Sequence, residues 1–224
     1  MPPIGIIFDM DGVLVDSGAA HLESWQRLAR EIGAGDIPDE RFTAVFGRTS
    51  ADIISAVLGP KTPDEIRRLD DRKEAIYRDL IRGHVPVMPG AHDAVRRLHS
   101  AGMRIAVGSS GPRENIELVC AEMGLHPYLS GIVTGRDVQR GKPDPQVFQL
   151  AAERMHLEPS RCIVIEDAPS GIEAAHRAGM SCIALTGSHP AERLDHADKV
   201  IESLSALTPD VVHAVKVPDN THDR

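Results

Sequence analysis

The sequence contains few cysteines, and their arrangement excludes two common uses of this residue. Cys120, Cys162 and Cys182 are the only 3 cysteines in 224 residues, and they are widely spaced in apolar stretches. They form no CxxC pair or other metal-type spacing, so the pattern indicates reduced thiols in a core rather than a disulfide framework or a zinc site. We therefore expect a cytoplasmic location.

Long apolar runs and clusters of basic residues are also absent. No apolar stretch approaches the roughly 18 residues that a membrane-spanning helix needs, and the opening MPPIGIIFD lacks the features of a signal peptide. The formal net charge of −8 disfavours nucleic acid or an anionic membrane as the main partner. We expect a small anionic metabolite instead, since a local cation can reverse the field in one cleft, and a monomer or small homo-oligomer.

The sequence does contain a regular alternation of short apolar runs with amphipathic helical patterns. The runs typical of buried strands are IGIIF (4–8), RIAVGSS (104–110), GIVTG (131–135), CIVIED (162–167) and SCIALTG (181–187). Helical patterns lie between the last four, at 112–124, at 143–155 and around 171. Strand and helix repeated in this way predict the α/β class, with a Rossmann-like parallel sheet and helices on both of its faces.

The interval 16–88 interrupts this alternation because it contains no convincing strand. Its segments HLESWQRLAREIG, SADIISAVLG and TPDEIRRLDDRKEAIYRDLIR all have helical periodicity. In the first, the apolar stripe is predicted to contain Trp25, Leu28 and Ile32, and the last begins with a Thr62–Glu65 capping box. We expect an α/β core formed by 1–15 and 89–224, and an all-helical cap domain, 16–88, inserted after the first strand.

Polar and charged residues follow four of the predicted strands. They are Asp9 and Asp11 after the first strand, Ser109 and Ser110 after the second, Lys142 in the loop after the third, and Glu166 and Asp167 after the fourth. Singly, each group has an ordinary explanation, such as a turn or a helix cap. Ligands of open α/β sheets bind at the carboxyl ends of strands, so we expect all four groups to meet in one cleft. Several carboxylates near an amine and hydroxyl groups fit Mg²⁺ facing an anion.

Together the four motifs resemble those of the haloacid dehalogenase superfamily, in the branch with a helical cap inserted after the first strand. DMDGVLVDS is similar to its nucleophile motif, GSS to its hydroxyl motif, GKPDP to its lysine motif and IEDAPSGIEAA to its acidic metal motif. The resemblance covers about residues 4–190. Within the superfamily it is greatest for the β-phosphoglucomutases and the related sugar-phosphate phosphatases.

The resemblance implies a role for each acidic residue. Asp9 would attack phosphorus and form an aspartyl-phosphate. Asp11 would protonate the leaving oxygen and later deprotonate the incoming one. Asp9, the carbonyl group of Asp11, and Asp167 would hold Mg²⁺, and Glu166 would either bind the ion or support its ligands.

The resemblance also implies a phosphate site and a substrate site. Ser109, Ser110 and Lys142 would bind phosphoryl oxygens, and Gly12 would let the backbone approach the phosphate. In the cap, His21, Arg48 and Lys73 would contact the substrate. Without that role, His21 would be a core or boundary residue, Arg48 a solvated charge, and Lys73 a lysine that extends its ammonium group to solvent.

Several reactions are known among proteins with these motifs. The metal-free dehalogenases lack the second acid, and phosphonate cleavage also replaces it, so Asp11 argues against both reactions. We expect a Mg²⁺-dependent phosphohydrolase of small phosphorylated metabolites, with sugar phosphates as the substrate class. The alternative is a β-phosphoglucomutase-type phosphotransferase. A non-catalytic binding relative is disfavoured because every catalytic position is filled.

Overall fold

The computed structural model describes residues 3–38 and 50–215. The chain divides into two compact units, one formed by Met1–Asp16 with Val85–Arg224 and the other by Ser17–His84. The boundaries expected from the sequence lay after residues 15 and 88. We refer to the two units as the α/β unit and the helical unit, and each is described by itself.

The α/β unit contains a six-stranded sheet in which all neighbouring strands are parallel, in the order β3-β2-β1-β4-β5-β6. The strands are β1 (Gly5–Phe8), β2 (Arg104–Gly108), β3 (Leu129–Val133), β4 (Cys162–Glu166), β5 (Ser181–Leu185) and β6 (Lys199–Ile201). The predicted α/β class is confirmed. Since the chain runs outward from β1 through β2 and β3 and then returns beside β1 as β4, the strand order reverses between β1 and β4, where ligands of such sheets bind.

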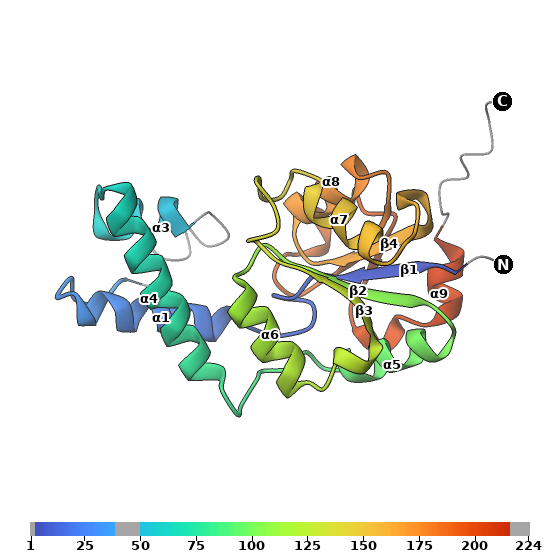
Figure 1. Ribbon diagram of the computed structural model, residues 1–224, viewed down its shortest axis with the longest axis horizontal. Coiled ribbons are helices and arrows are strands. Elements are labelled where there is room, and N and C mark those ends of the chain that lie inside the picture. The colour runs from blue at the N-terminus through green and yellow to red at the C-terminus, as the bar shows by residue number, and fades with distance from the viewer. Residues whose placement is uncertain (1–2, 39–49, 216–224) are drawn as a thin grey trace. The chain divides into compact units, whose positions relative to one another are not determined.

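Helices cover both faces of this sheet. They are α5 (Ala91–Ser100), α6 (Arg113–Glu122), α7 (Gln146–Arg154), α8 (Pro169–Arg177) and α9 (Pro209–Ala214). Figure 1 shows α7 and α8 on one side of the sheet and α5 and α6 on the other. α7 packs on β1, β2 and β3, whereas α8 packs on β4 and β5. The strand β6 and the helices α5 and α9 were not predicted. β6 has only three residues and begins with an exposed lysine, so it has no apolar run to mark it.

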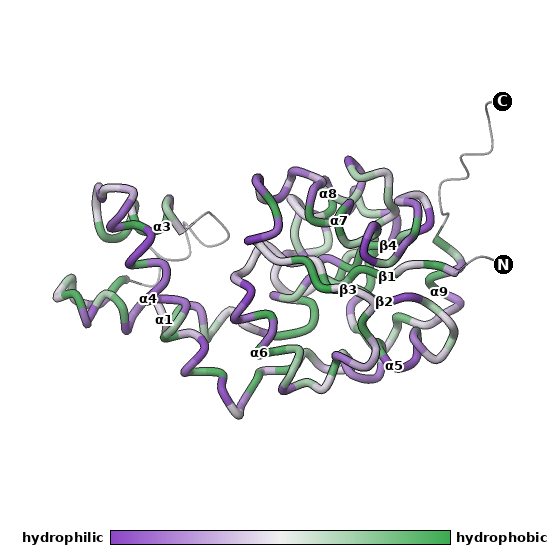
Figure 2. The backbone as a smooth tube through the Cα atoms, viewed as in Figure 1, coloured by the Kyte–Doolittle hydropathy of each residue, from purple (hydrophilic) through white to green (hydrophobic). Residues whose placement is uncertain are grey.

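Burial on both faces explains why the strands read as continuous apolar runs. Every residue of β1, β4 and β5 is buried, as expected for a parallel sheet covered by helices on both sides. In Figure 2 the tube is coloured as hydrophobic along β1 and β4. All three cysteines are buried and free, as the sequence indicated. Burial raises the pKa of the Cys120 and Cys162 thiols to about 12, so both remain protonated.

The helical unit has α1 (Gly18–Glu31), α3 (Ser50–Leu58) and α4 (Pro63–Ile81), and none of its described residues lies in a strand. Trp25 and Leu28 of α1 pack with Ile54 and Ile76 in its core. The prediction that Ile32 shares this apolar stripe is wrong. α1 ends at Glu31, so Ile32 follows the last helical residue and is 43% exposed.

The start of α4 has the predicted capping box. The Thr62 side chain accepts a hydrogen bond from the Glu65 backbone N–H, and the Glu65 carboxylate accepts one from the Thr62 backbone N–H. These two bonds satisfy two donors that the first turn of a helix otherwise leaves without partners. Pro63 follows at the first helical position, where a missing N–H costs nothing.

We expect Thr62→Ala to lower the free energy of unfolding by about 1 kcal/mol, because the Glu65 N–H loses its acceptor. Thr62→Ser keeps a hydroxyl group and should lose much less. Urea denaturation followed by circular dichroism measures both values. Equal losses in the two variants would mean that the hydroxyl group does not cap the helix.

Candidate active site at the carboxyl ends of the strands

The ends of β1 and β4 bring three buried carboxylates together. Asp9 directly follows β1, Glu166 is the last residue of β4, and Asp167 comes next. Phe8 pairs with Ile165, and the Asp9 N–H donates to the Ile165 carbonyl at 3.0 Å, so the register places Asp9 beside Glu166. One carboxylate oxygen of each of the three acids lies within 4.8 Å of the other two. We call these three residues the carboxylate cluster.

Lys142 crosses from the loop after β3 into this cluster. Its ammonium group donates to Asp9 Oδ1 and to Glu166 Oε1, both at 2.6 Å. The same nitrogen lies 4.8 Å from the centre of the Phe148 ring. Burial by itself opposes a charge on this side chain, but the carboxylates of Asp9 and Glu166 outweigh it and raise the pKa of Lys142. Lys142 therefore remains a cation.

Glu166 is held by three donors. Its Oε2 accepts the backbone N–H groups of Asp167 at 2.8 Å and Ala168 at 2.9 Å, while Oε1 accepts from Lys142. A Cβ atom at Gly171, in the first half of α8, would overlap the Glu166 carboxylate. Glycine at this position therefore leaves the space that the carboxylate occupies.

The negative charge of the cluster exceeds the positive charge beside it. Burial raises the pKa of Asp9 well above its ordinary value, although Lys142 opposes the shift, and the neighbouring acids raise it further. Burial and then the Glu166 carboxylate raise the pKa of Asp167 to about 7. Since one ammonium group faces three buried carboxylates, a bound cation would relieve their repulsion. All the donor atoms of the cluster are carboxylate oxygens, which suit a hard cation such as Mg²⁺.

Gly12 lies against the cluster in a backbone conformation that favours glycine. Its φ is +74°, and a Cβ atom there would overlap Asp167 Oδ2 and lie 2.6 Å from Ser188 Oγ. The resemblance to the haloacid dehalogenase superfamily implies a glycine needed for close approach to a phosphate. In the structure the atoms close to Gly12 belong to Asp167 and Ser188, so the protein itself requires glycine here.

Asp11 and Ser109 lie near the same loop after β2. Ser109 is buried, and its Oγ accepts the Gly111 N–H at 3.1 Å. A Cβ atom at Gly111 would lie 3.4 Å from Ser109 Oγ and 4.0 Å from Asp11 Oδ2. The side chain of Ser110 is exposed, and its backbone carbonyl packs closely against Gly135. The structure thus brings Asp11 and Ser109 together, while Ser110 contributes its backbone to the packing of the loop.

Two of the three cap residues contact each other inside the helical unit. Lys73 Nζ lies 2.7 Å from His21 Nδ1 and 2.7 Å from Glu74 Oε1. The His21 ring stacks on Tyr77 with 4.2 Å between the ring centres. Lys73 is only 3% exposed, so it does not extend its ammonium group to solvent. Arg48 lies outside the described residues.

Ser188 and His189 reach Asp167 and were not singled out from the sequence. His189 Nδ1 lies 3.1 Å from the Asp167 backbone oxygen, and the Ser188 hydroxyl group hydrogen-bonds to the Asp167 side chain. Both residues follow β5, whose apolar run was assigned only as far as Gly187. The same reasoning about strand ends that selected Asp9 would have selected them.

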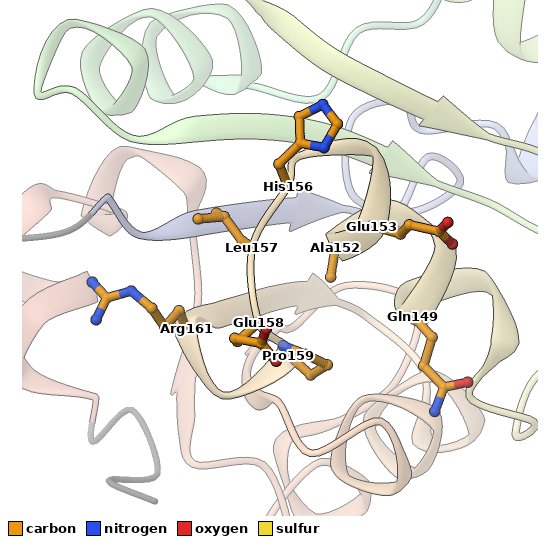
Figure 3. Close-up of a pocket in the computed structure, with 8 residues that line it drawn as sticks. All are labelled: Gln149, Ala152, Glu153, His156, Leu157, Glu158, Pro159 and Arg161. Atoms are coloured by element: carbon orange, nitrogen blue, oxygen red, sulfur yellow. The ribbon is translucent and has the colours of Figure 1, made fainter. Parts of the chain in front are cut away.

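A surface hollow of about 510 Å³ lies elsewhere, between the end of α7 and the start of β4. Figure 3 shows its lining side chains on α7 and on the segment that follows it, which includes His156 and Arg161. This segment leads into the amino end of β4, whereas Glu166 is at the carboxyl end of that strand. The hollow is therefore not part of the carboxylate cluster.

The four motifs lie inside a stretch of sequence that matches a known protein family. Residues 6–185 fit the family of haloacid dehalogenase-like hydrolases. The chain belongs to this family. The resemblance drawn from the nucleophile, hydroxyl, lysine and acidic motifs is thereby confirmed. Along the part of the chain that the structure describes, no helix is long and apolar enough to cross a membrane.

Several members of this haloacid dehalogenase-like family are similar over most of the chain. Validoxylamine A 7'-phosphate phosphatase of Streptomyces hygroscopicus subsp. limoneus is 34% identical, with 90% of this chain and 94% of that protein covered. β-Phosphoglucomutase of Bacillus subtilis is 30% identical, with 93% of each covered. The chloroplastic 5-amino-6-(5-phospho-D-ribitylamino)uracil phosphatase of Arabidopsis thaliana is 35% identical over 92% of this chain, which spans only 56% of that protein.

A solved structure supports the fold. The crystal structure of a haloacid dehalogenase hydrolase of family IA, variant 3, from Entamoeba histolytica matches with a TM-score of 0.87. The match covers 95% of this chain and 98% of that one at 21% sequence identity. At this level of identity the likeness concerns the fold alone.

The contact between Gly171 and Glu166 leads to a stability prediction. We expect Gly171→Ala to lower the free energy of unfolding by about 2 kcal/mol, because Glu166 must move away from three buried donors. Gly18→Ala is the control, since a Cβ atom there meets nothing within 4 Å. Chemical denaturation compares the two variants. A loss in Gly171→Ala no larger than in the control would show that the Glu166 carboxylate can be displaced at little cost.

The raised pKa of Asp167 leads to a prediction about pH. In the folded chain this carboxyl group keeps its proton up to about pH 7, whereas its ordinary pKa is 3.8. Between these values the folded state binds more protons than the unfolded state, so the stability of the metal-free protein should fall as the pH rises. Asp167→Asn should weaken this dependence of stability on pH. Asp93→Asn, at an exposed position, is the control and should leave it unchanged. Urea denaturation in EDTA at about pH 5 and about pH 8 measures it. If the change in stability between these two pH values were the same in Asp167→Asn as in the wild type, the raised pKa of Asp167 would not be its cause.

Proposed function

We propose that this chain is a Mg²⁺-dependent phosphatase that hydrolyses small phosphorylated metabolites, with sugar phosphates as the substrate class. The observation that carries the proposal is the buried carboxylate cluster at the reversal of strand order, with the Lys142 ammonium group between Asp9 and Glu166. The phosphatases among its relatives support the same reaction. An anionic substrate would meet positive charge there only when Lys142 is joined by a cation.

In this proposal Asp9 is the nucleophile. One of its carboxylate oxygens attacks phosphorus, and the bond from phosphorus to the leaving alcohol oxygen breaks. Asp11, two residues further along, donates a proton to that oxygen. Water then attacks the aspartyl-phosphate, Asp11 accepts its proton, and inorganic phosphate leaves with Asp9 restored. Asp9 Oδ1 accepts from Lys142, so the other oxygen, Oδ2, is the one assigned to the attack.

Lys142 and Ser109 are assigned to the phosphoryl oxygens. The Lys142 ammonium group, 2.6 Å from Asp9 Oδ1, is placed to neutralise charge that develops close to the nucleophile. Ser109 Oγ accepts the Gly111 N–H, which leaves its own O–H hydrogen for donation to an anion. We also assign Ser110 and Gly12 to this phosphate site, as expected from the motifs.

Asp9 and Asp167 would hold Mg²⁺, together with the backbone carbonyl of Asp11. When bound, the ion would supply the positive charge that the cluster lacks and would reduce repulsion between Asp9 and the phosphoryl oxygens. All the hydrogen bonds described for Glu166 come from protein donors, so we assign it to support of Lys142 and of the Asp167 backbone.

The helical unit is proposed as the source of substrate specificity. His21 and Lys73 are its candidate substrate residues, together with Arg48. The contact between Lys73 and Glu74 keeps a buried cation paired. Arg48 is assigned to an anionic or hydroxyl-rich part of a sugar phosphate, away from the reacting phosphoryl group.

The proposal predicts which changes abolish phosphate release. Asp9→Asn should lower turnover of a responsive sugar phosphate by several orders of magnitude, since the amide is a poor nucleophile. Asp16→Asn is the matched control, because Asp16 belongs to the same motif but is exposed. EDTA should abolish activity, and Mg²⁺ should restore it. The measurement is release of inorganic phosphate from a panel of sugar phosphates. Turnover of Asp9→Asn within about tenfold of the wild type would overturn the mechanism.

A phosphomutase is the second candidate, favoured by the 30% identity to β-phosphoglucomutase over 93% of each chain. The two reactions differ in whether water or a sugar hydroxyl group takes the phosphoryl group from Asp9. The same panel, incubated with and without a sugar bisphosphate, separates them. A phosphatase releases inorganic phosphate in both cases, whereas a mutase converts one sugar phosphate isomer into the other and needs the bisphosphate.

A further inference from the structure

The loop after β5 turns back onto Asp167. β5 ends at Leu185, and Gly187 then has a φ of +145°, a conformation that favours glycine. The next two residues, Ser188 and His189, both contact Asp167. Asp167 belongs to the end of β4, so this loop links the carboxyl ends of two neighbouring strands.

The chemistry of the two contacts settles which group donates. A backbone carbonyl can only accept, so His189 Nδ1 carries the hydrogen in its 3.1 Å contact with the Asp167 backbone oxygen. The Ser188 hydroxyl group lowers the pKa of the Asp167 carboxyl group, as a donor to its ionised form does, so Ser188 donates to the carboxylate that would bind a cation. The Asp167 N–H is itself bound to Glu166 Oε2 at 2.8 Å. The backbone of Asp167 is thus held at both its N–H and its carbonyl group, and its side chain is held separately.

The position of Gly12 shows how closely these groups meet. A single Cβ atom at Gly12 would overlap Asp167 Oδ2 and lie 2.6 Å from Ser188 Oγ. The loop after β1, the end of β4 and the loop after β5 therefore converge at the Asp167 carboxylate. Movement of Ser188 would remove the donor that holds this carboxylate against Gly12.

We propose that Ser188 and His189 are positioning residues, which hold the Asp167 carboxylate and backbone in the orientation that binds the cation. The inference rests on the metal site of the proposed function and assigns a task to a loop that the catalytic motifs do not include. Hydrogen-bonding partners of metal ligands fix ligand orientation, and their loss typically weakens metal affinity by about 10- to 100-fold. Neither residue touches the reacting atoms in this assignment.

Two pairs of variants test the hydrogen bonds rather than the bulk of the side chains. Ser188→Ala removes the hydroxyl group, whereas Ser188→Thr keeps it. His189→Leu removes the donor at similar size, whereas His189→Asn places an amide N–H close to the position of Nδ1. Ser188 is exposed, so its replacement leaves the core packing intact. Ser130→Ala, an exposed serine on β3, is the matched control.

The measurement is the dissociation constant of Mg²⁺ for the full chain by calorimetry, with the melting temperature in EDTA recorded for each variant. We expect Ser188→Ala and His189→Leu to weaken Mg²⁺ binding about tenfold or more, and Ser188→Thr and His189→Asn to restore most of it. Ser130→Ala should bind like the wild type. If the two residues were only structural, their replacement would lower the melting temperature in EDTA. The loss of Mg²⁺ affinity and its recovery in the Thr and Asn variants would then not be seen.

Three results would overturn the inference. Affinities of Ser188→Ala and His189→Leu within about twofold of the wild type would show that the contacts do not orient Asp167. If Ser188→Thr and His189→Asn lost as much Mg²⁺ affinity as Ser188→Ala and His189→Leu, the shape of the side chains and not their hydrogen bonds would matter. A wild-type protein that binds no Mg²⁺ would remove the positioning role together with the metal site. If only the proposed phosphatase activity were wrong, the variants would still bind Mg²⁺ with the predicted differences in affinity, but the wild-type protein would release no phosphate.

Discussion

The Lys142 ammonium group donates to Asp9 and to Glu166 at 2.6 Å, and this bridge joins the loop after β3 to the ends of β1 and β4. Without it, three buried carboxylates would face one another with no cation among the described side chains of the cluster. Removing one partner of a buried charged group costs far more than an exposed ion pair contributes. The bridge therefore stabilises the carboxylate cluster, yet it leaves the cluster with excess negative charge, and that excess makes it a candidate metal site.

Local packing serves this arrangement at several points. Gly12 and Gly171 leave space for the carboxylates of Asp167 and Glu166, and side chains there would displace them. The backbone N–H groups of Asp167 and Ala168, which precede α8, donate to the Glu166 carboxylate. The carboxylate is therefore fixed before any ligand binds. Fixed polar groups of this kind are what a phosphoryl-transfer site requires, since catalysis depends on charges that need not reorganise during the reaction.

The parallel sheet and the meeting of Asp9 with Glu166 could be predicted from the sequence, because strand register is a strong constraint. Once IGIIF and CIVIED are recognised as parallel neighbours, Asp9 and Glu166 must emerge at the same edge of the sheet. Ser188 and His189 were missed because the apolar run of β5 was followed only as far as Gly187, although their place after a strand end could be read from the sequence. Their contacts with Asp167 could not, because they depend on the φ of Gly187 and join the ends of two strands. Ile32 was assigned to the apolar stripe because periodicity does not mark where α1 ends. The Lys73–His21 contact spans 52 residues of sequence, and periodicity within one helix says nothing about such a pairing.

The central claim is that the carboxylate cluster is completed by a divalent cation. Mn²⁺ can replace Mg²⁺ at oxygen sites and is visible by anomalous diffraction, so a crystal of the wild-type protein soaked in Mn²⁺ tests the claim most directly. We expect one strong anomalous peak in contact with the carboxylates of Asp9 and Asp167, and no such peak in an Asp167→Ala crystal. A wild-type crystal with no peak at the cluster, or with its peak at another site, would contradict it.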